Sequence, residues 1–183
     1  MKRKVYFHED DYCQIEILPL TAKNFCLKQI GEIDEFADKH SEKFGFSDMY
    51  VRDESPYSIK EVEISQEKIA EVLDFLPEFD EVDSEYLRWI EDSEPVFSRG
   101  IDNDTAVFWE KDEKGIISAM WLGMYIIPEN RDVWQRILTA LGSIASLLLV
   151  DWCAGICVDL ADVKEIGNYI NKIVNYTEQE NLK

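Results

Sequence analysis

Five residues near the N-terminus carry side chains that can bind metal ions: His8, Glu9, Asp10, Asp11 and Cys13. Imidazole, carboxylate and thiolate groups are the usual protein ligands of zinc, so these residues could in principle build a metal centre. In an extended chain, however, alternate side chains point to opposite faces, and at most about three of the five could converge. Their order also matches no established ligand spacing. We therefore predict a structural turn at this position and no metal site.

The four cysteines are the next candidates for chemistry. Cys153 and Cys157 are spaced like one half of a zinc site, but such a site needs a second ligand pair. Cys13 and Cys26 lie too far apart in the sequence to supply it. We predict that all four thiols are free, as in a reducing compartment, and mostly buried as small apolar side chains.

Nucleophilic catalysis needs a nucleophile beside a general base. The only histidines are His8 and His40, and neither is next to a recognisable serine or cysteine motif. The 8 glycines are scattered and form no phosphate-binding loop. We therefore predict no enzyme, no catalytic residues and no cofactor. Carboxylate pairs that hydrolyse glycosides are positioned by the fold, so spacing cannot identify one among 38 acidic residues, and a small hydrolase with an unrecognised carboxylate site stays open.

Charge is the strongest signal in this sequence. The chain has 38 acidic and 19 basic residues, a formal net charge of −19, and residues 61–100 hold 13 acids against Lys68, Arg88 and Arg99. Such a field repels phosphate backbones and anionic lipids, so we expect no direct nucleic acid and no membrane partner. It attracts a basic protein. The alternative is that acidity only keeps the protein soluble.

The segment 78–94 combines this acidity with aromatic residues, including Phe79. Steering by charge followed by burial of an apolar anchor is how many protein partners associate. The alternative is a solvated loop with Trp89 in the core. We predict that the partner-binding surface comprises Glu78, Asp80, Glu81, Asp83, Glu85, Tyr86, Trp89, Glu91 and Asp92.

Targeting and membrane signals are weak. The charged start Met1-Lys2-Arg3-Lys4 leads to a short apolar stretch that ends at His8, which is unlike a secretory leader. The uncharged run 137–150 is shorter than the roughly 20 residues that span a bilayer. The sequence therefore predicts a cytoplasmic protein, and nothing in it indicates an oligomeric state.

Hydrophobic periodicity predicts the elements of the N-terminal half. Alternating apolar residues indicate strands at 4–7 and 13–18, expected to form a hairpin, and at 59–64. Apolar residues three and four apart indicate helices at 25–40 and, capped by Ser65, at 66–76. Residues 78–94 are predicted as a loop leading into a short helix.

The C-terminal half contains two further predicted hairpins. Residues 106–110 and 116–127 flank a turn with Gly115, and residues 145–152 and 156–159 flank one with Gly155. Helices are predicted at 131–141 and 162–176. The run 137–150 can be read as one helix or as a helix followed by a strand. Strands joined by short turns and interrupted by single helices predict an α+β fold, a mostly antiparallel sheet with helices packed on it, in a single domain over residues 1–183.

Two stretches support a family resemblance. Residues 147–162, with Leu-Leu-Leu-Val-Asp-Trp before the turn and Ile-Cys-Val-Asp-Leu-Ala-Asp after it, are followed by a helix with Tyr169, and residues 5–16 read Val-Tyr-Phe-His-Glu-Asp-Asp-Tyr-Cys-Gln-Ile-Glu. Both resemble segments of immunity proteins from bacterial polymorphic toxin systems of the Rhs and contact-dependent kinds. This resemblance implies a small cytosolic protein that occludes the active site of a cognate toxin, often a basic nuclease. An acidic adaptor or chaperone-like regulatory domain of a secretion or signalling assembly is the alternative.

Overall fold

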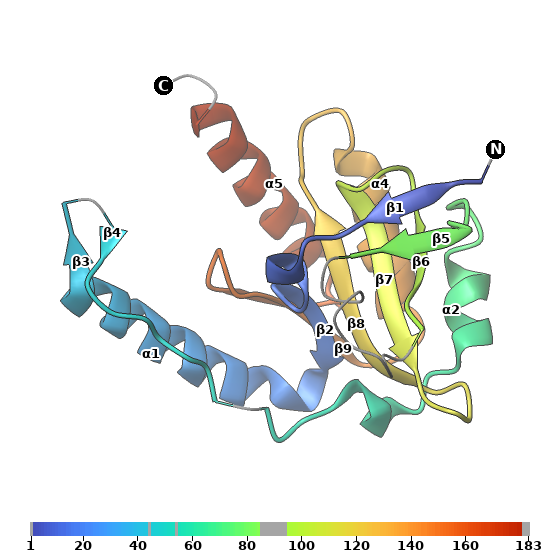
Figure 1. Cartoon of the computed structure of the whole chain (residues 1–183), viewed down its shortest axis with the longest axis horizontal. Coiled ribbons are helices and arrows are strands. Elements are labelled where there is room, and N and C mark those ends of the chain that lie inside the picture. The colour runs from blue at the N-terminus through green and yellow to red at the C-terminus, as the bar shows by residue number, and fades with distance from the viewer. Residues whose placement is uncertain (1, 44, 54, 85–94, 181–183) are drawn as a thin grey trace.

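Six antiparallel strands form the central sheet of the protein. The computed structural model describes residues 2–43, 45–53, 55–84 and 95–180. The strand order is β10-β9-β2-β8-β7-β6, so every neighbouring pair is antiparallel (Figure 1). The strands are β2 (Ile15–Pro19), β6 (Phe97–Gly100), β7 (Thr105–Lys111), β8 (Ile117–Met124), β9 (Leu147–Asp151) and β10 (Ile156–Asp159). The predicted α+β fold with a mostly antiparallel sheet is confirmed.

Glycine turns close the two predicted C-terminal hairpins, both of which are confirmed. Between β7 and β8, Gly115 has a φ of 79°, and the Asp112 carboxylate accepts hydrogen bonds from the backbone amides of Lys114 and Ile116. Between β9 and β10, Gly155 has a φ of 62°. Because L side chains rarely adopt such angles, glycine fits both turns.

The predicted N-terminal hairpin is wrong. Strand β1 (Lys4–Tyr6) pairs in parallel with β5 (Glu81–Asp83), which lies in the segment predicted as a loop, while β2 lies between β8 and β9. The 3-10 helix η1 (Glu9–Asp11) and the left-handed Cys13, with a φ of 56°, redirect the chain between β1 and β2. Val5 and Phe7 are buried against Phe108 and Trp121, and this packing outweighs the short local pairing.

Residues 59–64 were also predicted wrongly. They begin with the 3-10 helix η3 (Ile59–Val62), for which Ser58 and Glu61 form a reciprocal capping box, and Glu63 then adopts a left-handed φ of 49°. The capping box satisfies helix-end amides, which stabilises a helical turn over a strand. Ser65 caps α2 (Gln66–Val72) as expected, although this helix ends before residue 76.

The longer helices are α1 (Lys23–His40), α4 (Arg131–Gly142) and α5 (Val163–Glu180). The structure resolves the open question about residues 137–150, because α4 ends at Gly142 and β9 begins at Leu147. A Cβ on Gly142 would collide with the carbonyl of Leu160, so glycine permits this close approach. Within the described ranges, none of the helices combines the length and apolar character needed to cross a bilayer.

Both faces of the sheet are covered. On β9, Leu147 and Leu149 belong to the main core with α4 and α5, while Leu148 and Val150 pack against α1 on the other face. The pair β1–β5 covers that second face farther along, over Phe108 of β7. The result is three layers, visible in Figure 1 as β1 and β5 in front of the sheet and α4 behind it.

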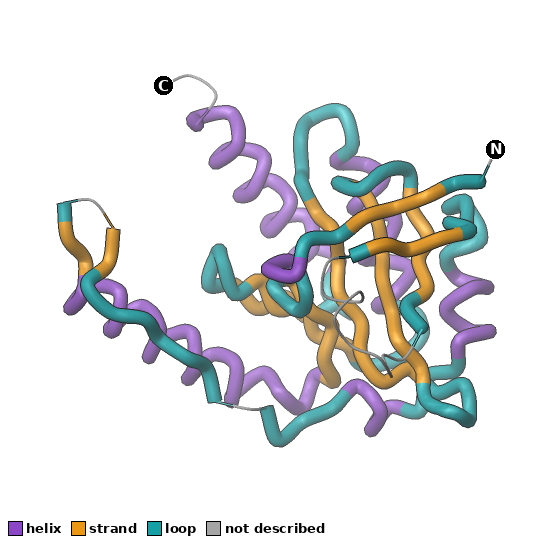
Figure 2. The backbone as a smooth tube through the Cα atoms, in the orientation of Figure 1, coloured by secondary structure: helices purple, strands orange, loops and turns teal. Residues whose placement is uncertain are grey.

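Helix α1 extends beyond the sheet. Its N-terminal part is anchored by Cys26 and Ile30, and the remainder projects as an arm that carries the short strands β3 (Ser41–Glu42) and β4 (Gly45–Phe46) at its tip (Figure 2). Phe46 and Met49, on the segment that returns along the arm, are exposed. The arm is thus attached to the body mainly at its base.

Candidate functional site

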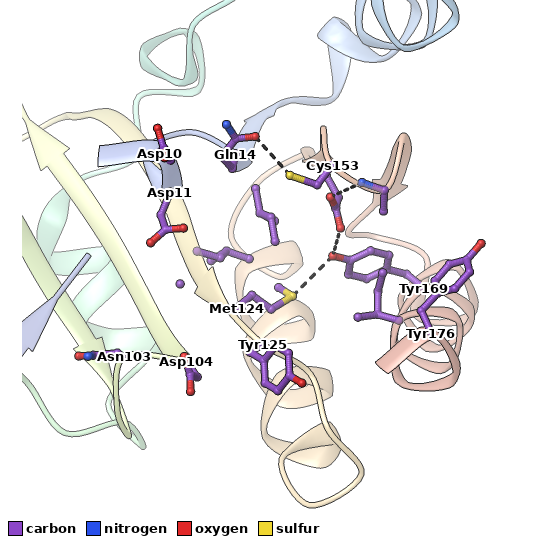
Figure 3. A pocket seen from close by; sticks show the side chains of 16 residues that line it. Asp10, Asp11, Gln14, Asn103, Asp104, Met124, Tyr125, Cys153, Tyr169 and Tyr176 are labelled. Atoms are coloured by element: carbon purple, nitrogen blue, oxygen red, sulfur yellow. Dashed lines mark hydrogen bonds between the residues drawn. The ribbon is translucent and has the colours of Figure 1, made fainter. Parts of the chain in front are cut away.

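A cavity of about 840 Å³ lies between the N-terminal loop, the end of β8, the β9–β10 turn and α5 (Figure 3). We call it the acidic cleft. Its carboxylates are Asp10, Asp11, Asp104 and Asp151, its amides Gln14 and Asn103, and its phenols Tyr125, Tyr169 and Tyr176. None of the 16 described residues that line it is lysine, arginine or histidine.

Asp151 forms the floor of the cleft and is 3% exposed. The Tyr169 hydroxyl donates to its Oδ2 over 2.8 Å, and the Ala154 amide donates to its Oδ1 over 2.8 Å. Burial, followed by the charge of Asp151, raises the pKa of Tyr169 well above 10, so the phenol stays a proton donor at neutral pH. These two donors fix the orientation of the carboxylate.

The rim carries the exposed acids Asp10, Asp11 and Asp104. Asp11 is held in η1, where its carboxylate accepts from the His8 amide over 3.0 Å. Asp104 follows Asn103, whose side-chain oxygen accepts from the Tyr6 amide over 3.1 Å and ties this turn to β1. Asp11 is therefore held within its own loop, and the turn that carries Asp104 is held against β1.

Cys153 is the only sulfur nucleophile among the described residues that line the cleft. Its thiol donates to the side-chain oxygen of Gln14 over 3.4 Å, a contact drawn in Figure 3. Burial, followed by the charge of Asp151, raises the pKa of Cys153 above 9. The group is therefore a protonated thiol at neutral pH, which is a poor nucleophile.

Charge and aromatic character make this cleft suited to cations. Four carboxylates lie around one cavity, and none of its described lining residues is cationic, so an ammonium or guanidinium group entering it gains several attractions at once. Tyr125 is half exposed, and a tyrosine ring face also attracts cations. The cleft can bind a basic side chain or another organic cation.

The acids predicted from the sequence as partner-binding lie elsewhere, on and before β5. Glu81 pairs with Lys4 over 2.7 Å, and Asp80 accepts from the Arg3 amide over 2.7 Å. Glu78 pairs with Arg99 over 3.2 Å, and Asp83 is half-buried. Internal partners thus weaken the field of this surface. The other predicted residues, Glu85, Tyr86, Trp89, Glu91 and Asp92, lie outside the described residues, so the predicted surface stays a prediction.

Phe79, expected as an exposed anchor in the same segment, is buried in the core beneath the β1–β5 pair. The guanidinium of Arg3 covers its ring, 4.4 Å from the centroid. The anchor prediction failed for Phe79 because its ring packs in the same buried cluster as Val5 and Phe7. A cation–π contact of this kind holds Arg3 in place.

The four thiols are free, as predicted, but the prediction that most of them are buried is wrong. Cys26 is fully buried, Cys13 and Cys157 are partly exposed, and Cys153 is exposed. In the described part of the chain, no three histidine, cysteine or acidic side chains are gathered so as to hold a metal ion. His8 and Asp10 instead contact each other within the predicted turn, over 3.4 Å.

Sequence reasoning missed the acidic cleft as a site. Asp10 and Asp11 were interpreted only as turn residues, and Asp151 only as the end of an apolar strand. The available signal was Asp151 itself, a charged residue directly after Leu147-Leu148-Leu149-Val150. A buried charge needs a partner, so its position already indicated a polar site.

Comparisons with protein-family models, curated proteins and solved structures found no match to this chain.

Proposed function

We propose that this protein binds a basic protein partner through the acidic cleft and neutralises it, in the manner of a cytosolic immunity protein acting on a toxin. The observation that carries the proposal is the cavity itself, where four carboxylates surround one opening and the described lining residues include no cation. A basic nuclease binds phosphate with cationic side chains, and the carboxylates of an inhibitor can bind these same side chains in place of phosphate.

The orientation of the floor supports binding. Asp151 is held by Tyr169 and Ala154 before any partner arrives, so little side-chain entropy is lost on association. The protonated thiol of Cys153 offers no activated nucleophile, which favours binding over catalysis. The rim acids Asp11 and Asp104 are exposed and can steer the approach of a cationic surface.

Two double variants of equal charge test this proposal. Asp11→Asn with Asp104→Asn removes two charges from the cleft, and Asp80→Asn with Glu81→Gln removes two from the β5 side. The partner is first captured from lysate of the source cells, identified, and purified. We expect a basic protein whose association is slowed by the cleft variant, with affinity lowered about two- to thirtyfold at low salt, as exposed ion pairs predict.

The β5 variant should leave affinity within about twofold of the unaltered protein, since Asp80 and Glu81 already have internal partners. Loss of affinity in the β5 variant alone would move the interface to the surface predicted from the sequence. Equal losses in both variants would mean that only total charge matters. Inhibition of the partner's own activity separates an immunity protein from an acidic adaptor, which would leave that activity intact.

Hydrolysis is the second candidate, because carboxylates on either side of a bound sugar are what glycoside hydrolysis requires, and the cleft gathers four of them. Turnover of chromogenic glycosides that disappears in Asp151→Asn would establish it. We favour binding, because Asp151 is enclosed by its two donors at the floor.

A further inference from the structure

A pair of cysteines joins α1 to the edge strand β10, on the side of the sheet away from the main core. Cys26 of α1 is fully buried there, and Cys157 of β10 packs against the cluster that contains it. The two thiols are close enough for each to shift the pKa of the other. One member of the pair is accessible, because Cys157 is partly exposed and lines an open cavity of about 270 Å³.

We propose that Cys157 is a peroxide-reactive thiol and that Cys26 is its resolving partner, so that oxidation closes a reversible disulfide between α1 and β10. Redox-sensing cysteines combine a stabilised thiolate, access to solvent and a neighbouring second thiol. The pair supplies the access to solvent and the neighbouring second thiol by its geometry. The oxidant is a hydroperoxide, for example hydrogen peroxide.

The groups around Cys157 supply the stabilised thiolate. The neighbouring thiol of Cys26 lowers the pKa of the Cys157 thiol below 9, and Lys23 of α1 lowers it further. Burial and Glu165 of α5 act in the opposite direction, and the net effect is a lowered pKa. Lys172 of α5 lines the same cavity but is not among the groups that shift this pKa. A larger fraction of Cys157 is therefore thiolate at neutral pH than in an unperturbed cysteine.

The reaction balances with one peroxide for each pair. The Cys157 thiolate attacks one peroxide oxygen, the O–O bond breaks, and the hydroxide that leaves takes up a proton and becomes water. The sulfenic acid formed on Cys157 is then attacked by the sulfur of Cys26. The S–S bond forms, the S–O bond breaks, and the departing hydroxide takes the proton of Cys26 as a second water. Two thiols are oxidised and one peroxide is reduced.

The closeness of the two thiols sets the order of these two steps. While Cys157 is a thiolate, its charge retains the proton of Cys26, because the pKa of Cys26 is raised by this neighbour and by burial. Oxidation of Cys157 removes the negative charge that retains this proton. Cys26 is thus unreactive at first and becomes a nucleophile only after its partner has been oxidised.

The other cysteines of the chain are an internal control for the reactivity of Cys157. Cys153 is more exposed than Cys157, yet burial and the charge of Asp151 raise its pKa. Cys13 has its pKa raised to about 12, chiefly by burial and Glu16. If exposure alone governed reactivity, Cys153 would react first. If the pair and its charges govern it, Cys157 reacts first, and this inference does not depend on the function of the acidic cleft.

The test uses the native, reduced protein and hydrogen peroxide at one equivalent. We expect a mass loss of two hydrogens, a Cys26–Cys157 disulfide in the peptide map, and full recovery by a reducing agent. In the unoxidised protein, iodoacetamide at neutral pH should label Cys157 several-fold faster than Cys153. Faster labelling of Cys153, or oxidation of Cys157 to sulfinic acid without a disulfide, would overturn the proposal.

Variants separate the roles of the two thiols. Cys26→Ser should halt the reaction at the Cys157 sulfenic acid, detectable with dimedone, whereas Cys157→Ser should abolish reaction of the pair. Lys23→Gln should slow the oxidation of Cys157. Lys172 lines the same cavity, so Lys172→Gln is the matched control and should leave the rate of this oxidation unchanged. Equal rates in the two lysine variants would contradict the charge argument. The labelling of the unaltered chain decides the proposal even if a variant fails to fold.

Discussion

Replacement of Tyr169 by phenylalanine tests the floor of the acidic cleft. The variant keeps the ring in the core and removes only the hydroxyl that donates to Asp151 over 2.8 Å. Both residues are 3% exposed, so water does not replace the lost donor freely. A hydrogen bond to a charged group contributes about 1.5–3 kcal/mol, and Asp151 keeps the Ala154 amide, so we expect a loss of about 2 kcal/mol. For a chain of this size the melting temperature should fall by roughly 4–8 °C.

The assay is denaturant unfolding together with thermal melting, and Tyr176→Phe is the matched control. Tyr176 lines the same cleft from the same helix but is half exposed, so its hydroxyl should contribute within about 0.5 kcal/mol of zero. Tyr169→Phe should also cost less when Asp151 has already been changed to asparagine. Equal stabilities of the Tyr169 and Tyr176 variants would refute the argument that this bond holds the floor.

Two further outcomes are expected. Burial raises the pKa of Glu16 above 4.5, so the folded state binds more protons than the unfolded state and the contribution of this group is lost as pH rises through its folded pKa. Glu16→Gln, which can still accept from Trp152, should therefore gain stability relative to the unaltered protein between about pH 4 and pH 7, and a pH-independent difference in urea unfolding would contradict this. Gly142→Ala should lower the free energy of unfolding by about 1–3 kcal/mol, because the added Cβ collides with Leu160. Gly31→Ala has open space around its Cβ in α1 and should raise the free energy of unfolding by up to about 1 kcal/mol. A change of the same sign for both variants in unfolding experiments would show that the contact with Leu160 is not limiting.

Local signals in the sequence predicted much of this fold. The hairpins around Gly115 and Gly155 and the helices α1, α4 and α5 follow from turn residues and periodicity within short windows. The pairing of β1 with β5 could not be predicted in this way, because it depends on residues about 80 positions apart burying Val5 against a shared core. The capping box of η3 was readable as Ser58 and Glu61, but the apolar alternation beside it favoured a strand.

The candidate site was less predictable than the fold. The acidic cleft is assembled from Asp10, Asp104, Asp151 and Tyr169, which come from four separate parts of the chain. No spacing rule links such residues, since only the sheet order brings them together. The reactive cysteine pair has the same origin, because Cys26 and Cys157 meet only once α1 lies on β10.

The central position of β2 has a consequence for the order in which the protein can fold. Glu16 pairs with Trp121 and Ile17 pairs with Leu149, so both partners of this strand are made long after the strand itself. The nascent chain therefore carries an apolar strand that has no neighbour until β8 has left the ribosome and only one neighbour until residue 149 has followed, so the sheet cannot close before then. Fragments that stop before Leu147 should expose this strand, aggregate, and depend on chaperones, whereas shortening the far end of α5 leaves the strand order intact.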